Sequence, residues 1–115
     1  MCIYHLVAFL RLYPVETPKV LVAIKTLECF VGETAEFYCK ARGQPKPRLL
    51  WYKDDKLVPE DYDRYKIVTH TTTAGFSNSS LTIVDLTTLD DGTFVCEAVN
   101  VAGKDQCKAE LFVDG

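Results

Sequence analysis

The chain lacks most of the patterns from which catalytic and metal-binding sites are built. It has two histidines, His5 and His70, and neither stands at the spacing of a nucleophile and its base. It has no C-x-x-C pair, EF-hand or glycine-rich phosphate loop, and the acidic residues at 54–55, 60–63 and 90–91 are typical of turns on a solvated face. We therefore expect no enzymatic activity, no metal, no cofactor and no small-molecule substrate.

An excess of positive charge and a membrane-length apolar run are also missing. The 13 lysines and arginines are outnumbered by 16 acidic residues, whereas nucleic-acid and anionic-membrane binders usually carry a basic surplus. The apolar run at about 3–10 is far shorter than the roughly 20 residues of a membrane span, and it lacks the basic start and cleavage site of a signal peptide. We expect no nucleic-acid partner and no membrane insertion, and interpret 1–16 as a leader or disordered extension, a secretion signal being the alternative.

The chain does have many short runs rich in β-branched or alternating apolar residues. Within 34–41, Phe37 and Cys39 would point to one side and the charged residues to the other. No segment has the periodicity of a three-turn helix, and turn residues separate the runs. The predicted strands are 19–24, 27–31, 34–41, 49–53, 63–73, 79–84, 93–100 and 104–113. The proline-containing segment 42–48, the turn 54–56 and the crossing segment 85–92 are predicted as loops.

A tryptophan lies between two cysteines on these predicted strands. Trp51 follows Cys39 by 12 residues, and Cys96 follows Cys39 by 57. Two facing sheets would bring the inward cysteines together with the indole packed against them. With seven or more short strands, this arrangement is the signature of an immunoglobulin sandwich. We predict an all-β, immunoglobulin-like β-sandwich of two packed antiparallel sheets over residues 17–115.

More narrowly, the sequence resembles an I-set immunoglobulin domain over about residues 18–113. The matching segments include VGETAEFYCKARGQPKPRLLWYKDD, SSLTIVDL, DDGTFVCEAVNVAG and CKAELFV. The style is similar to modules of titin, obscurin, twitchin and the myosin light-chain kinase group, although extracellular adhesion molecules share most of these features. For such a sandwich we expect the core to be packed by Trp51, Phe37, Leu81, Ile83, Leu86, Phe94 and Leu111.

The resemblance implies a non-catalytic interaction and mechanical module, one unit of a larger cytoplasmic muscle or cytoskeletal protein. Its partners would be other proteins, including neighbouring immunoglobulin-like modules. The patch between 19–24, 27–31 and 104–113 would act as a mechanical clamp, with outer charges on Glu28, Lys104 and Lys108. Two alternatives remain: an extracellular adhesion or receptor domain, and a regulatory module attached to a kinase or exchange factor.

The segment before the second core cysteine resembles a tyrosine corner. Asp90 and Gly92 stand at the expected positions, but the aromatic residue is Phe94. Phenylalanine can fill the core but cannot donate the hydroxyl hydrogen bond of the motif. We predict a looser corner, by about 1 kcal/mol.

Five cysteines leave at least one thiol without an intramolecular partner. Cys39 and Cys96 are the predicted core pair; we expect thiols in the cytosol and a disulfide in an oxidising compartment. Closing that 57-residue span would stabilise the fold by about 4 kcal/mol on the loop-entropy model. Cys29 and Cys107 fall at inward positions on the first and last strands, so they form a second candidate pair, the alternative being small buried apolar side chains.

Two surface features leave their roles open. Asn78-Ser79-Ser80 is a glycosylation sequon that would carry a glycan only in a secreted protein. Arg42, Lys46 and Arg48 form a basic trio after Cys39, which is either ordinary surface charge or a small anion or partner patch.

Overall fold

A computed structural model describes residues 14–115; most of the predicted leader, with Cys2 and His5, lies outside them. Within the described residues the chain forms nine strands and one 3-10 turn. In chain order the elements are β1 (Glu16–Val22), β2 (Leu27–Phe30), β3 (Ala35–Gln44), β4 (Arg48–Lys53), β5 (Lys56–Leu57), β6 (Tyr65–Thr71), β7 (Phe76–Ile83), η1 (Thr88–Asp90), β8 (Gly92–Asn100) and β9 (Gly103–Asp114).

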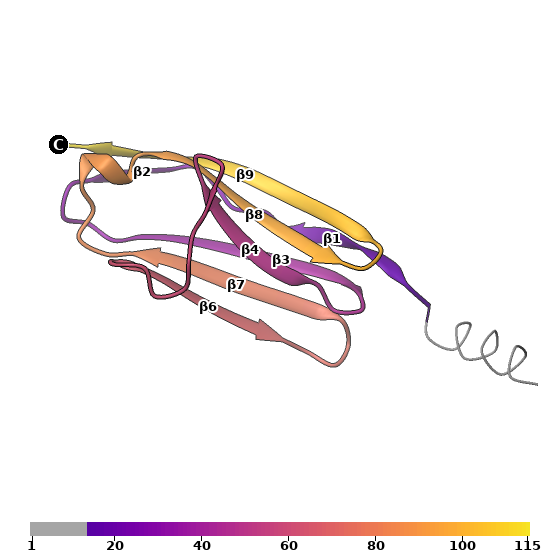
Figure 1. Cartoon of the computed structure of the whole chain (residues 1–115). Coiled ribbons are helices and arrows are strands. Elements are labelled where there is room, and N and C mark those ends of the chain that lie inside the picture. The colour runs from indigo at the N-terminus through magenta and orange to yellow at the C-terminus, as the bar shows by residue number, and fades with distance from the viewer. Residues whose placement is uncertain (1–13) are drawn as a thin grey trace, which may run out of the picture.

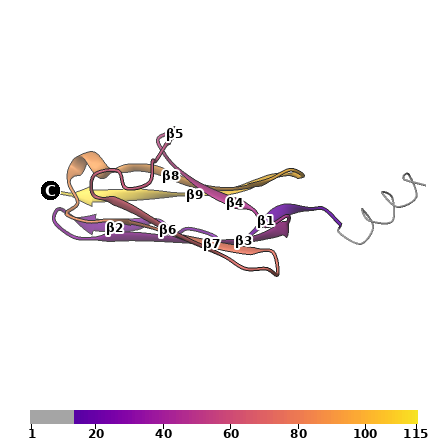
Figure 2. The ribbon, with the colours of Figure 1, turned by 60° about the horizontal axis from the view of Figure 1, so that its bottom comes forward.

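These strands form two packed sheets (Figure 1), which Figure 2 shows nearly edge-on. One sheet has the order β1-β3-β7-β6 and the other has the order β2-β9-β8-β4-β5. The neighbouring strands are antiparallel, except that β2 pairs with β9 in parallel. The predicted all-β sandwich is confirmed.

The core lies between the sheets because the strands alternate in polarity. Along β3 the inward residues, among them Phe37 and Cys39, are buried and the residues between them face outward. The facing strand β7 alternates in the same way. Every residue expected to pack the core is at most 1% exposed: Phe37, Trp51, Leu81, Ile83, Leu86, Phe94 and Leu111.

Several strand ends differ from the sequence prediction. The strand β3 runs on to Gln44 and β4 begins at Arg48, so the predicted loop 42–48 shrinks to three residues. The extra residues of β3 pair with β1, a partner distant in sequence. Pairing between distant segments also lengthens β7: it begins at Phe76 rather than 79, because Phe76 pairs with Arg42 on β3.

Two further segments were assigned incorrectly. The predicted strand 19–24 is β1, which begins at Glu16 and ends at Val22 before the chain crosses to the other sheet. The predicted loop 85–92 contains η1, whose first turn is closed by a capping box between Thr87 and Asp90. Short helical turns of this kind leave too little periodicity to be recognised in a sequence.

The described chain enters at one end of the sandwich and leaves at the other (Figure 1). At the N-terminal pole, the Asn100 side chain donates hydrogen bonds of 2.8 Å to the carbonyl oxygens of Glu16 and Pro45. At the C-terminal pole, the amide of Val31 donates to the carbonyl of Asp114 at 2.9 Å. The N-terminal pole is the end that contains the 45–47 and 101–102 turns. The C-terminal pole is the end that contains η1 and the end of β9.

Candidate functional site

The predicted core cysteines lie in the centre of the sandwich, beside a third cysteine. Cys39 and Cys96 are completely buried, and Cys96 stands opposite Trp51 on β4 and opposite Cys107 on β9. The sulfur atoms of Cys39 and Cys107 are 3.8 Å apart. The four described cysteines carry free thiols. Cys39 therefore has two cysteine neighbours in the core rather than the single one expected.

The second predicted pair, Cys29 with Cys107, is wrong because of the strand register. Cys29 stands opposite Val113 in the parallel β2–β9 ladder. Cys107 precedes Val113 by six residues on the same extended strand, which corresponds to about 20 Å. The sequence did contain the correct signal. A two-residue turn at 101–102 places residue 107 opposite Cys96.

Hydrogen bonding within this cluster gives the three thiols different acidities. The hydrogen bond with Cys107, with burial, raises the pKa of Cys39 to about 12. The pKa of Cys96 is also raised, by its hydrogen bonds with Cys107 and Cys39 and by burial. The pKa of Cys107 is lowered, because its thiolate would accept hydrogen bonds from Cys39 and Cys96. Cys107, which is only half-buried, is therefore the first thiol of the cluster to ionise.

The indole of Trp51 is held by a buried hydroxyl that sequence reasoning missed. Its Nε1 donates a hydrogen bond of 2.8 Å to Oγ of Ser79 on the opposite sheet. Ser79 is fully buried, and its Oγ also lies 2.9 Å from Oγ1 of Thr69. The alternation of β7 points residue 79 inward, but only the packing of the two sheets shows that its hydroxyl meets the indole.

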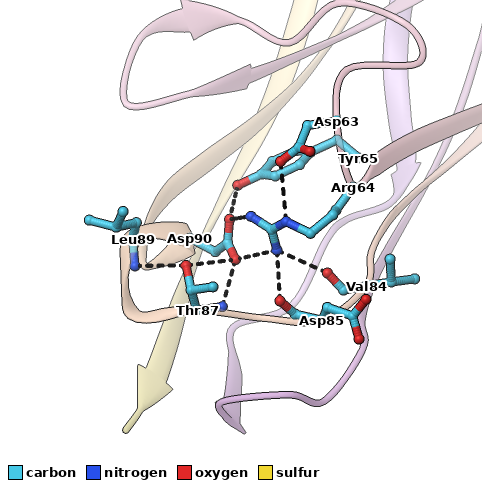
Figure 3. A network of polar contacts seen from close by, with 8 residues as sticks. All are labelled: Asp63, Arg64, Tyr65, Val84, Asp85, Thr87, Leu89 and Asp90. Carbon is cyan, nitrogen blue, oxygen red and sulfur yellow. Dashed lines mark hydrogen bonds and ion pairs between the residues drawn. The ribbon is translucent and has the colours of Figure 1, made fainter.

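Asp90 of the predicted corner is the centre of a polar network (Figure 3). Arg64 donates to both carboxylate oxygens of Asp90, at 2.9 and 3.0 Å, and to the carbonyls of Val84 and Asp85. The hydroxyl of Tyr65 donates to Oδ1 of Asp90 at 2.7 Å. The network ties the start of β6 to η1 and the end of β7.

The network fixes the charge of Asp90. Burial would raise the pKa of this carboxyl, but the hydrogen bonds from Arg64, the Thr87 backbone and Tyr65 lower it to about 2. Burial and the same carboxylate raise the pKa of Tyr65. Asp90 is therefore ionised and Tyr65 neutral at physiological pH.

Phe94, at the aromatic position of the corner, is fully buried, and its ring centroid lies 5.0 Å from that of Phe37. It fills core volume, while Gly92 takes a φ of 158° beside the Asp54 carboxylate. The corner is anchored by Asp90 and by a hydrogen bond of 2.9 Å from the Thr93 amide to Asp54. The looser corner remains a prediction about stability.

The terminal strands are held by a short parallel ladder and by side-chain bridges. The β2–β9 register runs from Leu27 opposite Leu111 to Phe30 opposite Asp114. The amide of Val20 on β1 donates to Oδ2 of Asp105 on β9 at 2.8 Å. The first strand is thus connected to both sheets, which is the arrangement that the clamp hypothesis needs.

The three charges assigned to the outer side of the clamp occupy different surroundings. Glu28 is exposed and stands opposite Phe112. Lys104 pairs with Glu97 at 3.7 Å, and Lys108 is exposed opposite Val95.

The remaining predicted surface features lie apart from one another. Asn78 is half-buried within β7, whereas the predicted strand began at 79, and it stands opposite Lys40 on β3 and His70 on β6. His70 is exposed on β6. The basic trio lies at the N-terminal pole, on β3, in the 45–47 turn and on β4.

An open hollow of about 580 Å³ lies between the β4–β5 turn and the segment before β6. Its lining includes exposed Leu57, Tyr62 and Leu89 together with Arg64 and Asp90. Arg64 and Asp90 are already bonded to each other, so they do not converge on a ligand. Within residues 14–115 no cluster of metal-binding side chains occurs, and no helix there is long and apolar enough to cross a membrane.

The sandwich, its central tryptophan and the cysteines beside it define an immunoglobulin-like module. The family model of the immunoglobulin I-set domain matches residues 18–113, so the chain belongs to this family. A similar solved structure is titin domain M7, with a TM-score of 0.77 and 24% identity, covering 89% of this chain and 98% of the titin domain. At that identity the likeness shows the fold alone.

Three curated relatives are similar in sequence. Smooth-muscle myosin light chain kinase of Gallus gallus is 37% identical, over 93% of this chain and 6% of its own length. Telokin of Meleagris gallopavo is 35% identical, over 93% of this chain and 69% of telokin. The cell adhesion molecule DSCAML1 of Homo sapiens is 35% identical, over 84% of this chain and 4% of its own length. The chain thus spans a small part of two of these proteins and about two thirds of the third.

Proposed function

We propose that this domain is a non-catalytic structural and protein-interaction module that bears load as one unit of a larger cytoplasmic muscle or cytoskeletal protein. The observation that carries the proposal is the parallel β2–β9 ladder, with the chain entering and leaving at opposite poles. A pull on the two ends draws β2 and β9 apart along their own axes. The ladder hydrogen bonds are then loaded together rather than one after another.

The side chain of Asp105 strengthens this arrangement. It accepts a hydrogen bond from Val20 and so joins β1, which belongs to the other sheet, to β9. A force on the N-terminal strand must break this bond as well as the β1–β3 and β2–β9 ladders. The similarity to smooth-muscle myosin light chain kinase supports the assignment to a muscle protein.

The test is single-molecule pulling in two geometries. Pulling the domain from its N- and C-terminal ends should need a clearly higher force than pulling from the N-terminal end and the 101–102 turn, because those two points lie at the same pole and do not draw β2 and β9 in opposite directions. Asp105→Ala should lower the force in the first geometry, and Gln106→Ala, at the exposed neighbouring position, should not. Equal forces in the two geometries would contradict the proposal.

A second candidate is an extracellular adhesion or receptor domain, favoured by the similarity to DSCAML1 and by the placement of Asn78 on an outer sheet face. One experiment distinguishes the cytoplasmic module from the extracellular domain. The protein is isolated from its own tissue, alkylated without reductant, and its intact mass is measured. Labelling of all the cysteines supports the cytoplasmic module. Protection of Cys39 and Cys96, with glycan mass on Asn78, supports the extracellular domain.

A third candidate is a regulatory module that positions a kinase or exchange-factor neighbour. The relative that favours it is smooth-muscle myosin light chain kinase, of which this chain spans 6%. The full-length transcript decides the matter: the HRD and DFG motifs of a kinase, or an exchange-factor domain, in the same reading frame would support this role.

A further inference from the structure

The two poles of the domain carry opposite charge. Basic residues predominate at the N-terminal pole, where Lys46 in the β3–β4 turn and Arg48 at the start of β4 are exposed. Asp105, on the same pole, already accepts the Val20 amide. The exposed basic residues of this pole are Lys19, Arg42, Lys46, Arg48 and Lys104. Arg42 pairs with Glu16 and Lys104 with Glu97, which leaves Lys19, Lys46 and Arg48 as the excess of positive charge.

The C-terminal pole is acidic. Arg64 is the basic side chain of the network in Figure 3. It is already paired with Asp63 and Asp90, so it does not neutralise the other carboxylates of this pole. Asp85 and Asp114 lie at the ends of the segments that meet there. The exposed acidic residues of this pole are Glu33, Asp63, Asp85, Asp91 and Asp114.

Each pole also presents one strongly exposed aliphatic side chain. Leu89 in η1 is 86% exposed at the C-terminal pole, and Val101 in the β8–β9 turn is 84% exposed at the N-terminal pole. These are the two most exposed large apolar side chains of the described residues. Each therefore has apolar surface that a contact could bury, next to a field of charge that would select the partner.

We infer that the acidic C-terminal pole binds the basic N-terminal pole of a second copy of this chain, so that the domains meet head to tail. The same contact would orient successive modules of a longer protein, and in that respect the inference rests on the proposed function. The contact is heterologous, so it forms linear rows rather than closed dimers. In this contact the basic trio of Arg42, Lys46 and Arg48 forms one side of the interface.

The contact is weak between free copies and becomes significant when modules are linked. Exposed ion pairs contribute about 0.2–1 kcal/mol each, and the end of a sandwich offers little area compared with a stable interface. A short linker raises the effective concentration of the neighbouring pole to the millimolar range. The interaction also depends on salt, since the Debye length falls from about 30 Å at 0.01 M to about 10 Å at 0.1 M.

Charge reversal with complementation tests the inference. One variant, Lys46→Glu with Arg48→Glu, lowers the charge of the basic pole by four units. The other, Asp114→Lys with Thr88→Lys, raises the charge of the acidic pole by three units and avoids Asp85, whose φ of 50° favours a short polar residue. The control, Lys25→Glu with Lys108→Glu, reverses two exposed lysines between the poles, beside the middle of β9. Circular dichroism and thermal melting verify that every variant is folded.

Sedimentation velocity of the full chain at low salt measures the association. The wild type and the control should self-associate, and each pole variant alone should do so about tenfold more weakly. An equimolar mixture of the two pole variants should recover the association, and 0.5 M salt should abolish it in every sample. In nitrogen–proton NMR spectra, concentration should shift the amides near Lys46, Val101, Leu89 and Asp114.

Three outcomes would overturn the inference: a wild type that stays monomeric at millimolar concentration and low salt, a mixture no more associated than its components, or equal weakening by the control. If only the basic-pole variant loses association, the acidic partner is another surface of the chain and the head-to-tail contact is wrong. None of these results bears on the pulling experiment, so the load-bearing role and the pole contact can fail separately.

Discussion

Arg64 and Asp90 form a bidentate ion pair, in which Nη1 and Nη2 of Arg64 donate to the two carboxylate oxygens at 2.9 and 3.0 Å. The Asp90 side chain is 4% exposed and the Arg64 side chain 26%. The guanidinium also donates to two backbone carbonyls of the segment after β7. One side chain thus neutralises a buried charge and fixes a loop.

Replacing Arg64 should therefore be costly. We expect Arg64→Met to lower the free energy of unfolding by about 2–3 kcal/mol, because Asp90 stays buried without its main charged donor. Arg42→Met is the matched control, since Arg42 pairs with Glu16 at 3.5 Å on the exposed surface, where the loss should be under about 1 kcal/mol. Urea denaturation measures both. Equal losses would contradict the role assigned to Arg64.

The same carboxylate predicts a loss of stability in acid. The pKa of Asp90 is lowered to about 2 in the folded protein, from 3.8 without the fold. A lowered pKa gives stability that is present above the unfolded value and disappears as pH falls through the folded value. We expect Asp90 to account for about 2 kcal/mol lost between about pH 4 and pH 2. The free energy of unfolding of Asp90→Asn should depend less on pH in this window, and an unchanged slope would refute the assignment.

Ser79 should matter far more than its neighbour in the sequon. Ser79→Ala removes the acceptor of the Trp51 indole and leaves a buried N–H group without a partner, at a cost of about 1–3 kcal/mol. Ser80 alternates to the outer side of β7, so Ser80→Ala should change stability by less than about 0.5 kcal/mol. Thermal unfolding of the two variants provides the comparison. Similar melting temperatures would exclude a structural role for the indole hydrogen bond.

Alkylation should follow a fixed order among the described cysteines. Cys107 is half-buried and its pKa is lowered, so it should react first. Cys29 is also half-buried, but burial and the charge of Glu33 raise its pKa. Cys39 and Cys96 are buried with raised pKa values and should react last. Timed iodoacetamide labelling with peptide mass mapping reads the order; Cys29 reacting before Cys107 would disprove it.

The sequence predicted the parts of the site that depend on local pattern. Alternation in 34–41 indicated which residues of β3 face the core, and the spacing of Cys39, Trp51 and Cys96 indicated the sandwich. Both succeed because a strand buried on one face must alternate with period two. The strand ends were less well predicted, because Arg42 and Gln44 are held in β3 by pairing with β1, which no local preference reveals.

Contacts between distant segments account for what was missed. Arg64 was one of the residues of the predicted strand 63–73, and Ser79 was the middle residue of a sequon. Their roles depend on Asp90 and Trp51, which are 26 and 28 residues away in sequence. The pair Cys29–Cys107 failed because alternation gives the face of a residue but not its position along a neighbouring strand.

The sequence by itself determined the class of fold, the apolar core and the central cysteines and tryptophan. It could do so because a strand that is buried on one face has apolar residues at alternate positions. Only the tertiary structure decided which cysteines are neighbours, which arginine neutralises Asp90 and how charge divides between the two poles. These features arise from register and from the packing of one sheet on the other, and both join residues that are far apart in the sequence.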